Sequence, residues 1–242
     1  MRNQPLHNLM AQAPRGQPMD TEMLREMGVS ERSLSHLVSA AWLERLGRGA
    51  YLLRGDQPTQ DGILAFLSRR ITGLHVGGKT ALDWQGVRHN VAFRQKVVLW
   101  GEAPYRFPDW VDQHLLYSYQ TTDLFDESFQ YGEGLKPIPN GNPSVLVSAP
   151  ERAFLELVSD VGKGQTLEEV QNIVVTMRSL RAPVLHMFMQ HCTRIKVLKL
   201  ARTLGEDSGF DWGKDLQQYV DQRSQGKRWS NKMNDVRITL KP

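Results

Sequence analysis

The stretch GVSERSLSHLVSAAWLERLGRGAYLL, residues 28–53, decides the fold of the first part of this chain. Ser30 is a residue type that caps helix N-termini, and a periodic apolar pattern begins just after it. The apolar residues keep the three-and-four spacing of one helix face: Leu34, Leu37, Val38 and Ala41. This spacing predicts a helix over residues 31–41 that buries one face and leaves the other in solvent.

A change of period follows that helix. The segment WLERL (42–46) has the character of a strand, and a Gly-Arg-Gly turn centred on Arg48 leads back into AYLL (50–53). Glycine on either side of Arg48 supplies the positive φ that a tight hairpin needs. We therefore predict a two-stranded β-hairpin directly after the helix.

Two helical segments are predicted before residue 28. PLHNLMAQAP (5–14) has apolar residues at helical spacing, and TEMLREM (21–27) is preceded by a capping Asp20 and followed by Gly28. The order of elements is then helix, helix, turn, helix and hairpin. This order is typical of a winged helix-turn-helix, which we assign to residues 1–56.

The outer face of the 31–41 helix carries hydroxyl, guanidinium and imidazole groups, which can bond base edges or phosphates. Such a helix fits the major groove of B-DNA, and arginines on the hairpin would reach the backbone or the adjacent minor groove. We expect Arg32, Ser33 and His36 to influence which sequence is bound. We expect Arg45 and Arg48 to supply mostly salt-dependent affinity. The predicted DNA-binding residues are Ser30, Arg32, Ser33, Ser35, His36, Ser39, Arg45 and Arg48.

The remaining residues, 57–242, predict a larger mixed α/β domain. QKVVLWG (95–101) and HLLYSY (114–119) have the composition of strands, and VLVSAPERAFLELVSDV (145–161) predicts a strand that enters a helix. Ser148 and Glu151 fit a capping box for that helix. The segment 131–144 has the composition of a loop. The predicted fold class is α+β, with an N-terminal winged helix followed by this larger domain.

Composition bounds the kind of protein. The chain has 242 residues, 40% hydrophobic content and a single cysteine, so it can bury a core but cannot form a disulfide within itself. The sequence shows no apolar run near the length of a membrane span and no secretory leader, and we expect a cytoplasmic protein without a membrane partner.

Positive charge is concentrated towards the C-terminus. Residues 178–242 hold 13 Lys and Arg against 6 Asp and Glu, within a net charge of +4 for the chain. This region could contact RNA or the DNA backbone, or it could be a solvated face with Trp229 as a core anchor. The residues of this possible second nucleic-acid or antitoxin surface are Arg194, Lys196, Lys199, Arg202, Lys227, Arg228 and Trp229.

The winged-helix stretch resembles the N-terminal domain of AbiEi-type antitoxins, from bacterial type IV (abortive infection) toxin–antitoxin systems. The family motif, a tryptophan-led strand followed by Arg-Gly-x-Tyr, corresponds here to Trp42, Leu43, Arg45, Arg48, Gly49 and Tyr51. Ala41 stands where the family pattern has glycine. The stretches 73–89 and 147–158 also resemble family segments, so the likeness covers most of residues 20–160.

The resemblance implies a transcriptional repressor and antitoxin without catalytic activity or a cofactor, active in phage defence. Such a protein would bind double-stranded DNA at inverted repeats in its own promoter. It would counteract a toxin resembling a nucleotidyltransferase, without needing a stable complex with it. One alternative is a winged-helix regulator that has no toxin partner. Glu31 and Glu44 near the predicted DNA surface keep open a further use of the winged helix, contact with another protein.

Enzyme alternatives rest on three short patterns. GLHVGGKT (73–80) matches the G-x-x-x-x-G-K-[ST] phosphate-binding loop, but the segment before it reads as a helix rather than a strand. The acidic residues Asp123, Asp126 and Glu127 could hold Mg²⁺, although exposed acids are far more often simply solvated. His186, His191 and Cys192 lie close in sequence but do not reach the ligand count of a zinc site, and we predict no metal.

Overall fold

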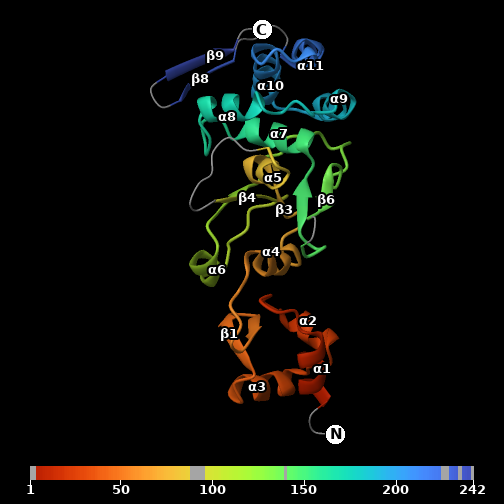
Figure 1. The fold of residues 1–242 in the computed structure, drawn as a ribbon, viewed down its shortest axis with the longest axis vertical. Coiled ribbons are helices and arrows are strands. Elements are labelled where there is room, and N and C mark those ends of the chain that lie inside the picture. The colour runs from red at the N-terminus through yellow and green to blue at the C-terminus, as the bar shows by residue number, and fades with distance from the viewer. Residues whose placement is uncertain (1–3, 88–95, 139–140, 225–228, 234–235, 241–242) are drawn as a thin grey trace.

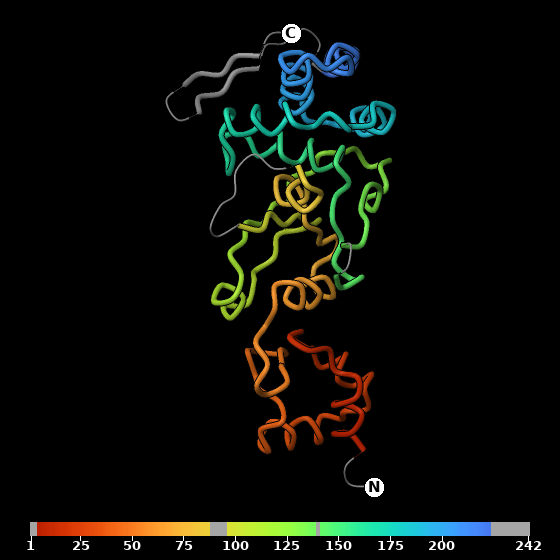
Figure 2. Tube along the Cα trace, in the orientation of Figure 1, coloured from red at the N-terminus to blue at the C-terminus, as the bar shows by residue number. Residues whose placement is uncertain are grey.

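The computed structural model describes residues 4–87, 96–138, 141–224, 229–233 and 236–240. The chain forms an elongated molecule with its two ends at opposite poles (Figure 1). The same path appears in the Cα trace, which runs from the winged-helix end, through a central sheet, to a group of helices (Figure 2). No helix within these ranges is both long and apolar enough to cross a membrane.

The N-terminal part is the predicted winged helix. Its buried residues form an apolar cluster that runs from Leu9 to Leu53 and is separate from the core of the larger part. The elements are α1 (Gln4–Gln12), α2 (Thr21–Glu26), α3 (Glu31–Ser39), β1 (Leu43–Gly47) and β2 (Ala50–Leu53). β1 and β2 pair antiparallel, as the hairpin prediction requires.

Side-chain caps start the second and third helices. The Asp20 carboxylate accepts from the Met23 amide at 2.7 Å, and the Ser30 hydroxyl accepts from the Ser33 amide at 3.2 Å. Each bond satisfies one of the amides that a helix N-terminus leaves without an intrahelical partner. Gly28 ends α2 with a φ of 82°, as its position in the sequence indicated.

Ala41 ends α3 in the left-handed conformation. Its φ is 60°, the one positive value among the non-glycine residues that the structure describes. The Trp42 amide bonds the Leu37 carbonyl at 2.9 Å and the Ala41 amide bonds that of Val38 at 3.0 Å, which is the hydrogen-bond pattern of a Schellman cap. The backbone at this position has a left-handed conformation. Glycine, the residue of the family motif, adopts this conformation without strain, whereas alanine adopts it only with strain.

The larger part is built on a mixed five-stranded sheet of order β5-β4-β3-β7-β6. Its strands are β3 (His75–Val76), β4 (Val97–Trp100), β5 (Tyr117–Gln120), β6 (Leu135–Pro137) and β7 (Leu146–Ser148). β3 pairs parallel with β7 and antiparallel with β4, so the short β3 joins the two halves of the sheet. The segment predicted as a loop over 131–144 contains β6, because pairing with β7 overrides its turn-rich composition.

Helices surround the sheet along the axis of the molecule. α4 and α6 lie towards the winged helix, while α5, α7 and the later helices lie on the opposite side (Figure 1). The helices are α4 (Gln60–Ser68), α5 (Gly78–Trp84), α6 (Asp109–His114), α7 (Pro150–Ser159), α8 (Leu167–Val174), α9 (Ala182–His191), α10 (Ile195–Asp207), α11 (Asp211–Asp215) and α12 (Gln217–Ser224). A hairpin of β8 (Trp229–Met233) and β9 (Val236–Leu240) follows them.

α7 is the central helix of the larger part, since every residue from 151 to 159 is buried. Its start differs from the prediction. The N-cap is Ala149, and Ser148 instead donates to the buried Glu156 at 2.8 Å. Glu151, the expected second half of the capping box, accepts from Arg181 at 2.9 Å. Burial of α7 draws both polar side chains into tertiary contacts.

The wing tip packs against the larger part. A Cβ on Gly47 would lie 2.8 Å from Trp110 Cδ1 in α6, so this glycine allows a close approach rather than a positive φ. The Gly49 carbonyl accepts from Arg70 at 2.7 Å, and Arg70 stacks over Phe66 at 4.4 Å. Gly49 does have the positive φ, 68°, that the hairpin turn was expected to need. The turn is thus held from both sides.

A second set of contacts joins the two parts beside the connecting segment 54–59. The Thr59 amide donates to the Gly16 carbonyl at 2.9 Å, and Arg69, at the end of α4, forms an ion pair with Asp20 at 3.2 Å. Within the N-terminal part, the Gly16 amide and Arg15 both donate to the Asp56 carboxylate at 2.9 Å. The division that we expected at residue 56 falls within the connecting segment and stays a prediction.

We expect Ala41→Gly to raise the free energy of unfolding by about 0.5–1 kcal/mol. Glycine removes the strain of the left-handed conformation, and this gain exceeds the conformational entropy that glycine loses on folding. Urea denaturation followed by circular dichroism measures the change. Ala40→Gly, one residue earlier at an ordinary φ of −80°, is the matched control and should lower stability instead. Equal effects of the two substitutions would contradict the assignment of strain to Ala41.

Candidate nucleic-acid interface

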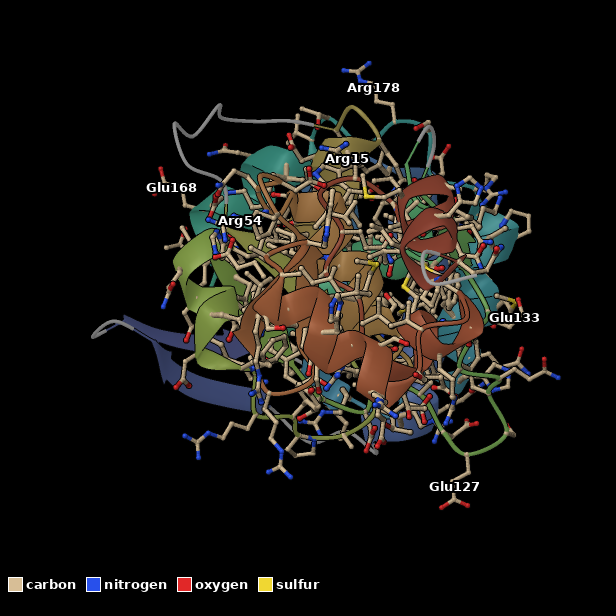
Figure 3. The ribbon with its side chains drawn as sticks, turned by 90° about the horizontal axis from the view of Figure 1, so that it is seen from below. Arg15, Arg54, Glu127, Glu133, Glu168 and Arg178 are labelled. Carbon is tan, nitrogen blue, oxygen red and sulfur yellow. The ribbon has the colours of Figure 1, made fainter. Side chains whose placement is uncertain are left out.

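α3 lies at the end of the molecule furthest from the larger part (Figure 1). Figure 3, which looks onto this end, shows the helices of the winged helix in front of the rest of the chain. Arg32, Ser35, His36 and Ser39 are exposed and Ser33 is half-buried, whereas Leu34 and Leu37 are buried below them. The polar face that the sequence predicted is therefore presented to solvent.

Hydroxyl groups on this face bond their own helix. Ser30 accepts from the Ser33 amide, and the two hydroxyls lie 2.9 Å apart. Ser35 donates to the Glu31 carbonyl at 3.2 Å, and Ser39 donates to that of His36 at 3.0 Å. These four serines shape the helix and its start. Arg32 and His36 form no side-chain hydrogen bond or ion pair with described residues, which leaves their donors available to a ligand.

A groove of about 460 Å³ runs between α1 and α3. It brings together Arg32, Ser33 and His36 from the predicted reading face. Trp42 also lines it and is 45% exposed, a high value for a tryptophan in a folded chain. The sequence reasoning treated Trp42 as part of the family motif but did not place it at the site. The signal in the sequence that could have placed Trp42 at the site was its position directly after the predicted helix 31–41.

The wing arginines lie on β1 and in the turn that follows it. Arg45 and Arg48 are both exposed, and Arg45 donates to the Gly47 carbonyl at 3.3 Å. The tip that carries Arg48 points to the larger part, where Trp110 and Arg70 hold it. The wing tip is thus tethered to the larger part, while its Arg48 side chain stays exposed.

The basic face expected on α10 does not form. Lys199 is 0% exposed, so its place on a nucleic-acid surface was wrong. Lys196 donates to the carbonyls of Ser159 and Val161 at 2.8 and 2.6 Å, and Arg202 bonds Gln217 at 2.6 Å. Of these four residues Arg194 alone is exposed. Lys227 and Arg228 lie outside the described residues, as does the side chain of Trp229.

Lys196 has a structural task at the end of α7. Carbonyls there lack intrahelical partners, and a lysine is favourable at the negative end of the helix dipole. Burial and then the charge of Lys163 lower the pKa of Lys196 to about 8. Burial also raises the pKa of the neighbouring Asp160 to about 6. These groups serve the packing of α7 against α10.

The 73–80 segment is not an open phosphate loop. The segment before it is helical, as predicted, since α4 spans Gln60–Ser68. The short strand β3 lies within the 73–80 segment itself, and α5 is only seven residues long. At its start the Gly78 amide donates to the Glu156 carboxylate at 2.9 Å. An internal anion therefore fills the position that a phosphate takes in such loops. Lys79 forms an ion pair with Glu169, and Thr80 accepts from the Val98 amide at 2.9 Å.

Glu156 is the centre of a buried polar network. Besides Gly78, its carboxylate accepts from Arg152 Nε at 2.9 Å and from Ser148 Oγ, and lies 3.0 Å from His75 Nε2. Nδ1 of His75 lies 2.8 Å from the Gly73 carbonyl, so both ring nitrogens face acceptors. A Cβ at Gly77 would lie 2.4 Å from the carboxylate, which explains that glycine.

Burial by itself would raise the pKa of the Glu156 carboxyl. The charge and hydrogen bond of His75 act against burial, as do Arg152 and the Gly78 amide, and they lower this pKa to about 2. The side chain is 1% exposed and carries its charge in the core. This network is a structural ion cluster, in which the histidine and the arginine are held rather than presented to a ligand.

The remaining candidate groups of the sequence do not converge. Within the described ranges, no three His, Cys, Asp or Glu side chains are placed to hold a metal ion. His191 pairs with Asp126 at 3.2 Å, while His186 faces the Tyr219 hydroxyl at 3.0 Å. Burial raises the pKa of Cys192 to about 11, so its thiol stays protonated near neutral pH.

Two family profiles match adjoining parts of the chain. Residues 2–93 match "Transcriptional regulator, AbiEi antitoxin N-terminal domain", and residues 94–241 match "Transcriptional regulator, AbiEi antitoxin, Type IV TA system". The chain is also similar to the crystal structure of the RV2827C protein from Mycobacterium tuberculosis. That match has a TM-score of 0.56 at 14% identity, and covers 91% of this chain and 80% of the other. At this identity it shows the fold alone. No curated protein matches.

Glu156→Gln should lower the free energy of unfolding by about 3–5 kcal/mol at neutral pH, because it leaves the charges of His75 and Arg152 buried without their counter-ion. The folded pKa of about 2 lies below the ordinary 4.5, so the carboxylate stabilises the fold fully above pH 4.5. That contribution is lost as the pH falls from 4.5 towards 2.

Urea denaturation of the two proteins between pH 3 and pH 7 measures this difference. The gap between wild type and variant should narrow below about pH 4.5. Glu168→Gln removes an exposed carboxylate from α8 and is the matched control, with an expected effect below about 0.5 kcal/mol. A gap that stays constant across this range would show that folding does not lower the pKa of Glu156.

Proposed function

Because this chain belongs to the AbiEi antitoxin family of transcriptional regulators in type IV toxin–antitoxin systems, we propose that it represses its own operon. The reading element is α3, which binds inverted repeats in the promoter through the major groove. Arg32 and His36 contact base edges, and Ser33 adds a weaker polar contact. The exposed position of α3 at one pole of the molecule is the observation that carries this proposal.

The shape of the molecule supports this arrangement. A duplex can reach α3 without meeting the larger part, because the larger part lies towards the opposite pole (Figure 1). The serines stabilise the helix locally, so sequence preference falls on the two side chains with free donors, Arg32 and His36. Trp42, in the same groove, offers an apolar surface to a thymine methyl group.

The wing arginines act on the DNA backbone. Arg48 is exposed while its flanking glycines are fixed, so its guanidinium reaches a phosphate from a rigid base. Arg45 lies three residues earlier on β1 and is also exposed. Both contribute affinity that falls with salt through release of counterions. Acidic Glu31 and Glu44, also exposed, limit this contribution.

The antitoxin activity belongs to the larger part and counteracts a nucleotidyltransferase-like toxin. This domain has its own extensive core around α7, which fits a second task performed apart from DNA. An RNA contact on the basic C-terminal region would depend on Arg194 and on residues after 224, because Lys196, Lys199 and Arg202 are engaged inside the fold. The nucleotide-dependent alternative is disfavoured, since Glu156 fills the anion position.

Footprinting on the protein's own upstream region tests the DNA proposal. We expect Arg32→Ala to weaken binding about tenfold or more and to relax the sequence preference. We expect Arg48→Ala to weaken binding on all sequences and to lower the slope of log K against log salt by about one unit, when two salt concentrations are compared.

Arg178→Ala is the matched control. It removes the same charge from an exposed residue that extends from the larger part (Figure 3), and should leave both the footprint and the salt slope unchanged. A wild-type protein that gives no footprint on its own promoter would refute autorepression. Equal losses for Arg32→Ala and Arg178→Ala would mean that only net charge matters.

The two activities should separate by mutation. We expect Arg32→Ala to relieve repression of a promoter–reporter fusion yet still protect cells that express the adjacent toxin gene. The physical reason is that α3 lies far from the larger part, whose core the substitution does not touch. Protein supplied from an unrelated promoter keeps antitoxin levels equal in both strains. Loss of both activities in a folded variant would place the antitoxin function on the winged helix.

A further inference from the structure

The larger part contains a cavity of about 810 Å³ that the DNA-binding proposal does not use. It opens between the end of β4 and the segment 122–131, beside the Glu156 network. We call it the acidic cavity, and the residues that define it are Trp100, Glu102, Asp123, Phe125, Phe129 and Tyr131. Its size is in the range of sites that hold a small molecule or a short piece of chain.

The acidic cavity carries negative charge without a counter-charge. Glu102, Asp123 and Glu127 are exposed, and none of them forms an ion pair with a described residue. Asp126, also in the lining, differs because Arg223 and His191 lie 3.4 and 3.2 Å from it. The lining arginine, Arg152, is neutralised by Glu156. A cation entering the cavity would therefore meet three carboxylates that the fold leaves unmatched, of which Glu102 and Asp123 are the two we test.

The arrangement suits a flat organic cation better than a metal ion. In the described part of the chain, no three metal-ligating side chains converge, here or elsewhere. Aromatic rings form the walls instead, with the centroids of Phe125 and Phe129 4.3 Å apart. The floor already holds one guanidinium in this way, since Arg152 lies 5.0 Å from the ring centroid of Tyr131 and 5.8 Å from that of Phe125. Guanidinium groups stack on such rings and pair with carboxylates.

The indole N–H of Trp100 needs a hydrogen-bond acceptor. Trp100 lines the acidic cavity and is 4% exposed, and its indole N–H is buried with no acceptor among the described residues. An N–H left in this state costs free energy that a carbonyl oxygen would recover. We propose that the acidic cavity binds an arginine presented by another protein chain, with its guanidinium at Glu102 and Asp123 and a backbone carbonyl at Trp100.

This proposal is independent of DNA binding, and the test uses the full-length protein without DNA. The probe is acetyl-Gly-Arg-Arg-Gly-amide, and citrulline replaces both arginines in the control peptide. The readout is the indole ¹H–¹⁵N signal of Trp100, assigned with Trp100→Phe. We expect the arginine peptide to shift this signal and the citrulline peptide to leave it unchanged. Agmatine has the guanidinium but no carbonyl, and should bind more weakly without moving the Trp100 signal.

Charge variants locate the site. The double substitution Glu102→Gln and Asp123→Asn should weaken binding of the arginine peptide roughly tenfold. Glu133→Gln is the matched control, because Glu133 is an exposed carboxylate close by in the chain that does not line the acidic cavity. It should leave the affinity unchanged. The proposal is overturned if the citrulline peptide binds equally, if the double variant keeps full affinity, or if agmatine matches the arginine peptide.

Discussion

The buried carboxylate of Glu156 is the interaction on which the larger part of the molecule depends. It lies on α7 and receives bonds from the start of α5, from β3 through His75 and from the end of β7 through Ser148. A buried charge is costly unless every lone pair is used, and here an amide, a hydroxyl, an imidazole and a guanidinium converge on it. Two helices and two strands are thereby fixed around one group. The same contacts explain Gly77, because the backbone there approaches the anion closely, whereas Gly78 has a positive φ of 51°.

This network changes the meaning of a familiar pattern. The letters of GLHVGGKT match a phosphate-binding loop, and the physics behind that motif, a glycine-rich turn whose amides face an anion, is present. The anion is supplied by the chain itself, 78 residues further along. The spacing of the glycines therefore predicts a loop whose amides face an anion, but it does not show which anion binds there. Lys79 and Thr80, which would serve nucleotide and metal in an enzyme, instead bond Glu169 and the backbone of β4.

Local signals predicted the local structure well. Asp20 and Ser30 cap their helices as expected, and the glycine expected in place of Ala41 corresponds to a left-handed residue in the fold. The failures share one cause, because each depended on contacts distant in sequence. Ser148 turns from a predicted cap to Glu156, β6 forms by pairing with β7, and Lys199, which we assigned to a possible nucleic-acid or antitoxin surface, is buried. For the candidate site, the sequence identified the exposed face of α3, but it could not show that the wing tip is tethered.

The tethered tip links the two parts of the molecule in a specific way. Gly47 lies against Trp110, the Gly49 carbonyl accepts from Arg70, and the Phe66 ring lies under Arg70 and 5.4 Å from that of Trp110. These contacts hold the wing against α4 and α6. In the proposed complex, DNA that contacts Arg48 would therefore bind a wing whose position is fixed by the larger part. At the same time α3 lies at the far pole, and the acidic cavity belongs to the larger part. In the arrangement that we propose, DNA binds at one end while the other end stays accessible, as separate repressor and antitoxin activities would require.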